Sequence, residues 1–437
     1  MTRRDVVTSL YDLVTGDEDA RVCKDIPAAA CREQPGNFFL QIGALTCTKI
    51  GDELASARLV LAWLLSAAGA PAFFTGLLVP IRESLSLLPQ LFVAAALRRQ
   101  PRRKWFWVAG SVIQGGCVAA MAAVALSLRN AAAGWAIIAL LVLFSLARGV
   151  CSVADKDVLG KTVSRTRRGR VSGYASTVAG FATVGAGAWL QFTGGGGASG
   201  TALFALLVGG ALLWLLSAGI YALIREEPGA TEGGANAGRE ALASLALVKT
   251  DVRFRRFIIT RSLLVSTALL LPFYTMLARE VGGAGAGALG MLLVASGLAT
   301  AASSALWGRM ADHSSRNVLR LAGLIAGLVS LGVSAWAMAG APGPAPGLLT
   351  AGAFLVMGVA HAGIRIGRKT YLVDMATMDT RATYVAVSNT LIGMVLLAGG
   401  GFGVVAQWLG TAATIGILGL ICLSGVVASG RLDEVTR

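Results

Sequence analysis

The chain has 437 residues, of which 55% are hydrophobic and only 14% are charged, and its mean hydropathy is +0.69. A soluble globular protein carries about 25% charged residues, so this composition argues against a soluble protein and indicates a polytopic membrane protein. The formal net charge of +15 does not point to nucleic acid. The basic residues lie in short clusters between apolar segments, where membrane topology accounts for them.

The first 35 residues form a polar arm that includes Asp17, Glu18 and Asp19 and shows no cleavable signal peptide. The arm has no histidine and no cysteine besides Cys23 and Cys31, so we expect free thiols there rather than a metal pair. Its apolar residues predict one short helix, either amphipathic on the membrane surface or an ordinary cytosolic helix. They are Val6, Val7, Leu10, Tyr11, Leu13 and Val14.

Twelve apolar segments follow the arm, each long enough to cross a bilayer, which takes about 20 residues. Their approximate spans are 38–68, 71–97, 105–128, 131–155, 171–192, 200–224, 257–279, 284–308, 317–340, 347–372, 382–408 and 410–430. One long polar connection separates the sixth segment from the seventh. The sequence therefore predicts a cytoplasmic arm (1–35), a six-helix bundle (36–224), a cytoplasmic linker (225–256) and a second six-helix bundle (257–437).

Basic residues gather in alternate connections, whereas the opposite connections hold only Arg129 and Arg279. Connections rich in lysine and arginine face the cytoplasm, so we expect both termini and the linker on the cytoplasmic side of the inner membrane. The basic clusters are Arg98 to Lys104, Lys161 to Arg170, the linker, Arg309 to Arg320, and Arg368 to Arg381.

The two halves repeat along the chain. A shift of 213 positions places Arg103 on Arg316, Lys156 on Lys369, Arg168 on Arg381, Thr177 on Thr390 and Arg148 on His361. A shift of 212 places Lys49 on Arg261. This repeat predicts two bundles related by an axis along the membrane normal, with a binding site between them near the midplane.

With these segments, the chain resembles the major facilitator superfamily. Residues 308–316, from Gly308 to Arg316, resemble that family's loop motif, and Arg148 resembles a buried arginine of its fourth helix. The stretch from Arg365 to Arg381 resembles the usual end of its tenth helix. The resemblance implies an all-α membrane protein with two pseudo-symmetric six-helix bundles around a central cavity. Such a protein works by alternating access, as a monomer and without a cofactor.

The chain departs from the family pattern in two places. The first-half copy of the loop motif has no acid, because Arg99 stands where the repeat has Asp312. The fifth segment has glycines but lacks the Gly-Pro pair that is usual in the family's drug antiporters.

Charged residues interrupt the first two apolar segments. Each would cost about 2.5–3.5 kcal/mol facing lipid at the bilayer centre, so we expect them to face protein and water. Asp52, Glu53 and Glu83 are the candidates for proton coupling, since neighbouring acids resist simultaneous ionisation. The alternative is a static ion-pair network with the nearby cations Lys49, Arg58 and Arg82.

One basic residue in each half is a candidate to hold the substrate. Arg148 and Arg261 carry the planar guanidinium that suits carboxylate or phosphate, and either could instead pair with a carboxylate of its own bundle. Lys49, Arg58, Arg82 and His361 complete the predicted substrate site, which favours an anionic or zwitterionic solute. Five aromatic residues are also candidates to line the cavity: Trp63, Trp189, Phe273, Tyr274 and Tyr384.

The loop motif predicts a cytoplasmic gate. Asp312, flanked by Arg309 and Arg316, would approach the N-terminus of the fifth helix near Arg168 when the inner side closes. In the mirror arrangement Arg99 and Arg103 would need an acid, which Asp374 or Asp379 could supply. The alternative is that these loop charges only set topology.

The sequence thus predicts a proton-coupled secondary transporter that moves a small anionic or zwitterionic organic solute across the lipid bilayer. A proton-driven efflux pump for drugs or metabolites is the first alternative, and a non-transporting receptor or scaffold on the same fold is the second. No metal site, nucleophile or nucleotide-binding motif is recognisable, so we expect no enzyme, no metal, no cofactor and no nucleic-acid partner.

Overall fold

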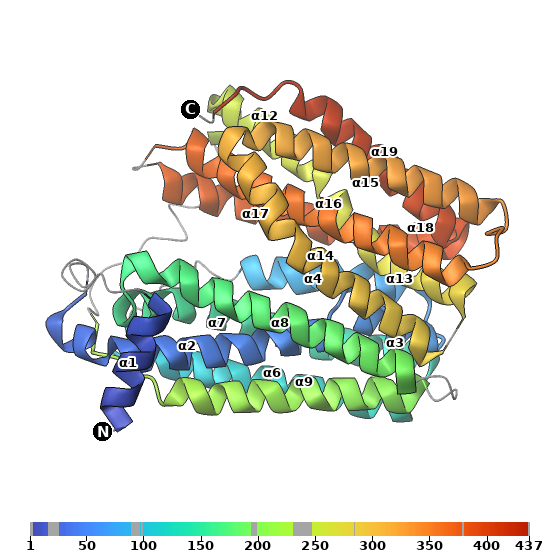
Figure 1. Ribbon diagram of the computed structural model, residues 1–437. Coiled ribbons are helices and arrows are strands. Elements are labelled where there is room, and N and C mark those ends of the chain that lie inside the picture. Colours follow the sequence, from blue (N-terminus) through green and yellow to red (C-terminus); the bar gives the residue numbers. More distant parts are fainter. Residues whose placement is uncertain are drawn as a thin grey trace.

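A computed structural model describes residues 3–15, 26–88, 97, 99–193, 199–229, 247–283, 285–377 and 380–435. Throughout this part of the chain the regular elements are α-helices. They form two bundles packed side by side, and both ends of the chain lie at the same end of the molecule (Figure 1). Most of the expected linker, residues 230–246, lies outside the described residues, and so does Asp379.

The first half of the molecule consists of α2 to α9, preceded by α1 from the arm. The helices are α1 (Arg3–Thr15), α2 (Ala28–Leu54), α3 (Val60–Ala67), α4 (Ala72–Leu87), α6 (Lys104–Ser127), α7 (Asn130–Thr162), α8 (Arg165–Thr193) and α9 (Ser199–Ala222). The second half begins after the short helix α11 (Leu247–Thr250). It comprises α12 (Val252–Leu264), α13 (Ser266–Gly282), α14 (Ala286–His313), α15 (Ser315–Met338), α16 (Pro346–Met375), α17 (Arg381–Gly399), α18 (Phe402–Leu409) and α19 (Thr411–Ser429).

Nine candidate spans in the described chain are long and apolar enough to cross a membrane. The first expected segment, 38–68, is not one of them. It is also broken, since α2 ends at Leu54 and α3 begins at Val60. The charged residues Asp52, Glu53 and Arg58 lie at this break. The second expected segment, 71–97, contains α4, and residues 89–96 lie outside the described part.

The arm helix α1 packs on the first half. The Tyr11 ring meets the Phe38 ring edge-on at a centroid distance of 5.3 Å, and the Gln34 amide donates to the Tyr11 hydroxyl at 2.6 Å. Leu13 is 82% exposed, so only part of the predicted apolar set packs on this half, and a membrane-surface position stays a prediction. The expectation of free thiols is wrong at Cys31, which is disulfide-bonded, and Cys23 lies outside the described residues.

The two halves are packed most tightly at the end far from the chain termini. A Cβ added to Gly76 of α4 would lie 2.3 Å from the Gly403 Cα of α18. A Cβ on Gly187 of α8 would lie 2.7 Å from the Gly290 carbonyl oxygen of α14. Backbone therefore meets backbone across the interface, and only glycine permits this approach.

Candidate functional site

A cavity of about 560 Å³ lies between the halves and is lined by α2, α4 and α6 to α8 on one side and by α12 to α14, α16 and α17 on the other. The cavity occupies the middle of the molecule and the part toward the chain termini. It uses residues 148–156 of α7 and 361–368 of α16. Beyond these residues, the C-terminal end of α7 packs on the arm, where Val163 and Tyr11 share an apolar cluster. The C-terminal end of α16 contacts the C-terminal segment, where the Tyr371 hydroxyl donates to the Asp433 carbonyl.

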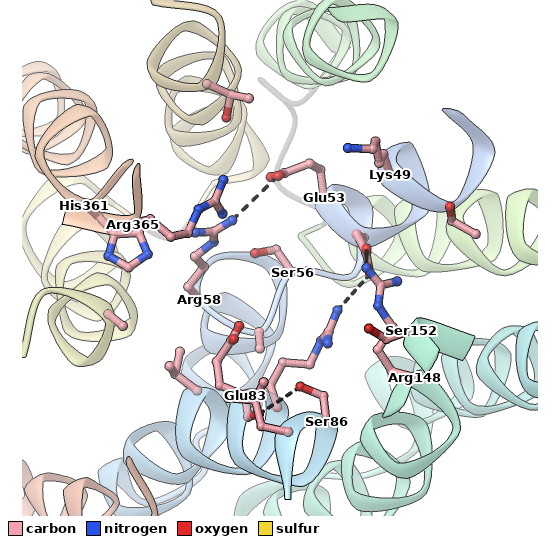
Figure 2. A pocket seen from close by; sticks show the side chains of 18 of the residues that line it. Lys49, Glu53, Ser56, Arg58, Glu83, Ser86, Arg148, Ser152, His361 and Arg365 are labelled. Atoms are coloured by element: carbon pink, nitrogen blue, oxygen red, sulfur yellow. Dashed lines mark hydrogen bonds and ion pairs between the residues drawn. The ribbon is translucent and has the colours of Figure 1, made fainter. Parts of the chain in front are cut away.

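The structure brings all nine predicted coupling and substrate-binding residues to this cavity. Figure 2 shows six of them by label, on the helices that surround the hollow: Lys49, Glu53, Arg58, Glu83, Arg148 and His361. Asp52, Arg82 and Arg261 also line it. Residues far apart in sequence are therefore neighbours here, as expected for a site between two halves.

Asp52 is held by two arginines of its own half. Arg82 of α4 donates to Asp52 Oδ1 at 2.8 Å, and Arg148 of α7 forms an ion pair with Asp52 Oδ2. The Arg82 guanidinium also lies 4.9 Å from the centre of the Phe144 ring. This cluster carries two positive charges and one negative charge. The contacts of Asp52 agree with the alternative interpretation, a static ion-pair network.

Glu53 takes part in a contact across the two halves. It pairs with Arg58 at 3.7 Å and accepts a hydrogen bond from Ser296 of α14 at 3.4 Å. The Arg58 backbone carbonyl accepts from the Thr275 hydroxyl of α13 at 2.9 Å. Residues 53–58, at the break in the first helix, therefore bridge the two halves.

Glu83 of α4 is the third predicted coupling acid. Its side chain is exposed to the cavity, and it makes no ion pair within the described chain. Figure 2 shows it between the break in the first helix and α4, apart from Arg148. Of the three predicted coupling acids, Glu83 is therefore the one that forms no ion pair within the described chain.

The second half presents arginines without carboxylate partners. Arg261 of α12 is only 8% exposed and donates to two neutral groups, Ser388 Oγ and Asn389 Oδ1, the latter at 3.1 Å. Its buried Nε has no acceptor among the described residues. Arg365 and Arg368 of α16 line the same wall, and neither makes an ion pair with the described residues.

Arg365 and Arg368 were missed by the sequence analysis as site residues. The sequence assigns both to the family motif, and Arg368 also to the basic cytoplasmic cluster, whereas α16 continues to Met375, beyond both residues. Their spacing of three residues, which puts both on one helix face, was the available signal. Asp155 and Lys156, on the cavity face of α7, were missed as well, because the predicted fourth segment ends at residue 155 whereas α7 continues to Thr162.

The remaining two predicted residues make neutral contacts. Lys49 donates to the Ser176 hydroxyl of α8 at 2.7 Å. His361 Nδ1 lies 3.1 Å from the Thr267 hydroxyl. Altogether the wall of the cavity carries eight basic and four acidic side chains, and all four acids belong to the first half. The basic ones are Lys49, Arg58, Arg82, Arg148, Lys156, Arg261, Arg365 and Arg368, and the acidic ones are Asp52, Glu53, Glu83 and Asp155.

No protein-family model and no curated protein sequence matches the chain. Solved structures do match it. A variant of the nucleoside transporter NupG has a TM-score of 0.69 at 13% identity and covers 90% of this chain and 99% of its own. A POT family transporter in complex with a thioalcohol-conjugated peptide has a TM-score of 0.68 at 10% identity, covering 92% and 97%. A D-xylose–proton symporter has a TM-score of 0.66 at 12% identity, covering 91% and 98%.

The chain has the major facilitator fold. The resemblance noted in the sequence is therefore confirmed at the level of the fold, including two bundles around a central cavity. The twelve-segment count is a prediction beyond the nine candidate spans of the described chain.

Within this fold, the predicted aromatic lining is wrong. Of the five candidates, Trp63, Phe273 and Tyr274 are buried in the helix packing, and none of the five lines the cavity. Trp189 is 49% exposed, and the Tyr384 hydroxyl donates to Asp251. The aromatic side chain that does line the cavity is Trp107 of α6.

The predicted gate residues lie at the end of the major facilitator fold that carries the chain termini. Asp312 and Arg309 are exposed at the end of α14, and Arg99 and Asp374 are exposed as well. Arg168 donates to the backbone carbonyls of Val163 and Gly160. None of these contacts joins the two halves, so the gating role stays a prediction.

Arg103 and Arg316 serve their own halves. Arg103 pairs with Asp157, and the backbone amide of Arg103 donates to Glu226, just after α9, at 3.0 Å. Arg316 pairs at 3.4 Å with Glu434, just after α19. These two arginines occupy equivalent positions of the repeat. Arg103 connects the start of α6 to the segment after α9, and Arg316 connects the start of α15 to the segment after α19. The acids near Arg103 are therefore Asp157 and Glu226, which lie far from it in the sequence.

Proposed function

We propose that the protein is a secondary active transporter that moves a small organic anion or zwitterion by proton-coupled alternating access. It would act as a monomer in the cytoplasmic membrane, with both termini in the cytoplasm. The observation that carries this proposal is the excess of positive charge on the cavity wall. In the second half, Arg261, Arg365 and Arg368 face the cavity and form no ion pair within the described chain. The nearest carboxylates to Arg365 and Arg368 are Glu53 and Glu83 of the first half.

Unpaired cations in a partly desolvated site are costly, because burying a charge without a counter-charge loses hydration that nothing replaces. An anionic solute would supply the missing charge. Arginine is suited to this role because its fork of N–H donors matches carboxylate and phosphate oxygens. Arg261 is prearranged for it, since Ser388 and Asn389 fix its terminal nitrogens.

The dimensions and chemistry of the cavity also favour a small polar solute. Its volume of about 560 Å³ lies within the range of roughly 300–1,000 Å³ that holds small molecules. Aromatic side chains are scarce on the wall, whereas hydroxyl groups are common, including Ser56, Ser152, Ser176, Thr183 and Thr300. Aliphatic side chains such as Leu45, Val79 and Leu271 complete the lining. The excess of basic over acidic side chains on the wall favours an anionic solute over a lipophilic cation.

The position of the cavity supports alternating access. The halves meet through glycines at the end far from the termini, while the cavity lies in the middle and toward the termini. With cytoplasmic termini this arrangement corresponds to an inward-facing state. Transport would require the glycine contacts to open and the terminal end to close.

Proton coupling is proposed on the acids of the cavity wall. Asp52 is committed to two arginines and Glu53 to Arg58. Glu83 is exposed and unpaired among the described residues, so it is better placed than the other two to exchange a proton with cavity water. One of the similar structures is named as a proton symporter, which agrees with this proposal without fixing the solute.

The test is thermal unfolding of the purified protein with succinate, gluconate, glycerol phosphate, lipophilic cations and uncharged sugars. A ligand at 100 times its dissociation constant should stabilise the protein by about 2.7 kcal/mol. We expect stabilisation by one or more of the anions, and loss of it in Arg261→Gln and Arg368→Gln. Arg309→Gln, which removes an exposed arginine outside the cavity, is the matched control.

Two results would contradict the proposal. Stabilisation by lipophilic cations alone would favour the efflux alternative, with the first-half acids as the binding site. Anion binding without any counterflow in liposomes would favour a receptor on the same fold.

A further inference from the structure

A fourth acid of the cavity wall has surroundings unlike those of the other three. Asp155 lies on α7, two turns beyond Arg148 toward the terminal end. Its Oδ1 accepts a hydrogen bond from the Tyr221 hydroxyl of α9 at 3.4 Å. It forms no ion pair within the described chain.

The phenol that contacts Asp155 is rigidly placed. Tyr221 is fully buried, and its ring stacks on the Trp107 ring at a centroid distance of 3.8 Å and an interplanar angle of 15°. Trp107 itself lines the cavity. Asp155 therefore has an ordered neutral donor on its bundle side and the cavity on the other.

The charged groups that act most strongly on Asp155 are basic, and the neutral Cys151 thiol lies one turn before it on α7. Lys49 comes from α2, and Arg148 and Lys156 come from α7 itself. α6 contributes no charged side chain at this depth, and α9 contributes Tyr221. Lys49 is hydrogen-bonded to Ser176, and Arg148 is engaged by Asp52, so neither is committed to Asp155.

We propose that Asp155 is the carboxylate that binds the coupled proton, and that a proton on Asp155 strengthens binding of the anionic solute. This inference rests on the proposed function. The step is a simple association: one proton from the cavity water binds to a carboxylate oxygen of Asp155, and no other bond is made or broken. Tyr221 is a positioning residue, since it contacts the carboxylate and not the solute.

The coupling follows from charge alone. An ionised Asp155 offsets one of the nearby cations and repels an anion in the same cavity. A neutral Asp155 removes both effects, so the wall attracts the anion more strongly. Binding linkage is reciprocal, so the anion must equally favour the protonated form of Asp155. Solute and proton are then bound together, which is the requirement for symport.

The test measures protons taken up when an anion binds. Purified protein in weakly buffered solution is mixed with the most stabilising of succinate, gluconate and glycerol phosphate, and a pH indicator follows the bulk proton concentration. The wild-type protein should take up protons and bind the anion more tightly as the pH falls. Asp155→Asn should still bind the anion, with no uptake and with an affinity that varies less than about twofold over the same pH range.

Asp157→Asn is the matched control, because Asp157 lies two residues further along α7 and pairs with Arg103 and Lys161 outside the cavity wall. It should retain proton uptake. Tyr221→Phe removes only the hydroxyl donor and should move the pH dependence of anion binding to higher pH, since the ionised carboxylate loses a hydrogen bond.

The outcomes separate this inference from the proposed function. If no anion binds to the wild-type protein, the proposed function fails first. If anions bind and Asp155→Asn takes up protons like the wild type, Asp155 is not the proton site. If uptake is lost instead in Glu83→Gln while Asp155→Asn keeps it, the proton belongs to Glu83. Should Asp155→Asn not fold, an unshifted pH dependence in Tyr221→Phe overturns the proposal.

Discussion

Asp155 and Arg368 stand 213 residues apart at equivalent positions of the two halves, and both face the central cavity. The same offset relates Ser152 to Arg365. The repeat therefore preserves which helix face lines the cavity, while the charges on that face have diverged. The first half supplies all four acids of the wall, and the second half supplies arginines without carboxylate partners in the described chain. A solute between them meets two chemically different walls.

We expect Asp52→Asn to destabilise the protein by about 2–3 kcal/mol, because Arg82 and Arg148 would lose their shared carboxylate. Removing one partner of a fully buried ion pair costs about 3–5 kcal/mol. The side chains here are 17–30% exposed, which lowers the cost through solvent screening. Chemical or thermal unfolding in detergent measures the change.

Glu83→Gln is the control for this prediction, since Glu83 is exposed and has no ion pair in the described chain. Such a substitution should change stability by no more than about 0.5 kcal/mol. Equal effects of the two substitutions would mean that the Asp52 contacts contribute little to the folded state.

Gly76 offers a test of the interface far from the termini. Alanine in a helix gains about 1 kcal/mol over glycine, but a Cβ here would lie 2.3 Å from the Gly403 Cα. The halves would have to separate, and overpacking typically costs about 1–3 kcal/mol. We expect Gly76→Ala to lower thermal stability. It should also speed labelling of a Ser152→Cys cavity thiol by an impermeant reagent added on the side away from the termini.

Gly116→Ala on α6 is the matched control, because nothing lies within 4 Å of the added Cβ. It should be neutral or slightly stabilising and should leave labelling unchanged. If Gly76→Ala behaves in the same way, the glycine contact does not hold this side closed.

How far the sequence predicts this site can be judged from individual residues. Charges inside apolar segments were informative, because an ionisable group at membrane depth must face protein or water; this placed Asp52, Arg148 and Arg261 correctly at the cavity. The predicted segment 347–372 contains Arg365 and Arg368. They were missed because basic residues near a helix end also serve as topology signals. The aromatic residues were wrongly placed, because a single aromatic carries no mark of which helix face it occupies.

Pairing was less predictable than placement. Composition and spacing put Asp52 beside cations, but the choice of Arg82 and Arg148 depends on how α2, α4 and α7 pack. Likewise the Glu226 contact with Arg103 joins residues more than a hundred positions apart. Such contacts are set by tertiary packing, which local patterns do not encode.

Asp251 gives a pH-dependent prediction at the entry to the second half. Its carboxylate caps α12 by accepting from the Arg253 and Phe254 amides and also accepts from Tyr384 of α17. Burial raises the pKa of Asp251, but these hydrogen bonds outweigh it and hold the pKa below its ordinary value. A carboxylate with a lowered pKa contributes stability above its unfolded pKa and loses it as the pH falls through the folded value.

We therefore expect Asp251→Ala to cost about 1 kcal/mol at neutral pH, the usual loss for a helix cap. The difference from the wild type should shrink below about pH 4, where the wild-type carboxylate also becomes protonated. Unfolding curves at neutral and acid pH measure it. Asp251→Asn, which can still cap the helix without a charge, should show a smaller loss at neutral pH, and this loss should also shrink as the wild-type carboxylate becomes protonated.

Asp312 tests the predicted gate. It is exposed at the end of α14 and makes no ion pair in the described chain, so Asp312→Asn should leave the stability of the present state within about 0.5 kcal/mol. If Asp312 meets the positive N-terminus of α8 when the terminal side closes, that contact stabilises the closed form by about 0.3–1 kcal/mol. Removing the charge should then shift the population toward the inward-facing state by roughly 2–5-fold.

Labelling of the Ser152→Cys cavity thiol from each side of the membrane measures this shift. In Asp312→Asn the rate should rise from the side of the termini and fall from the opposite side. His313→Gln, at the neighbouring exposed position, is the control and should change neither rate. Unchanged rates in Asp312→Asn would leave the residue as a solvated charge that sets topology, and the gate would have to be sought among the arginines that follow α7 and α14.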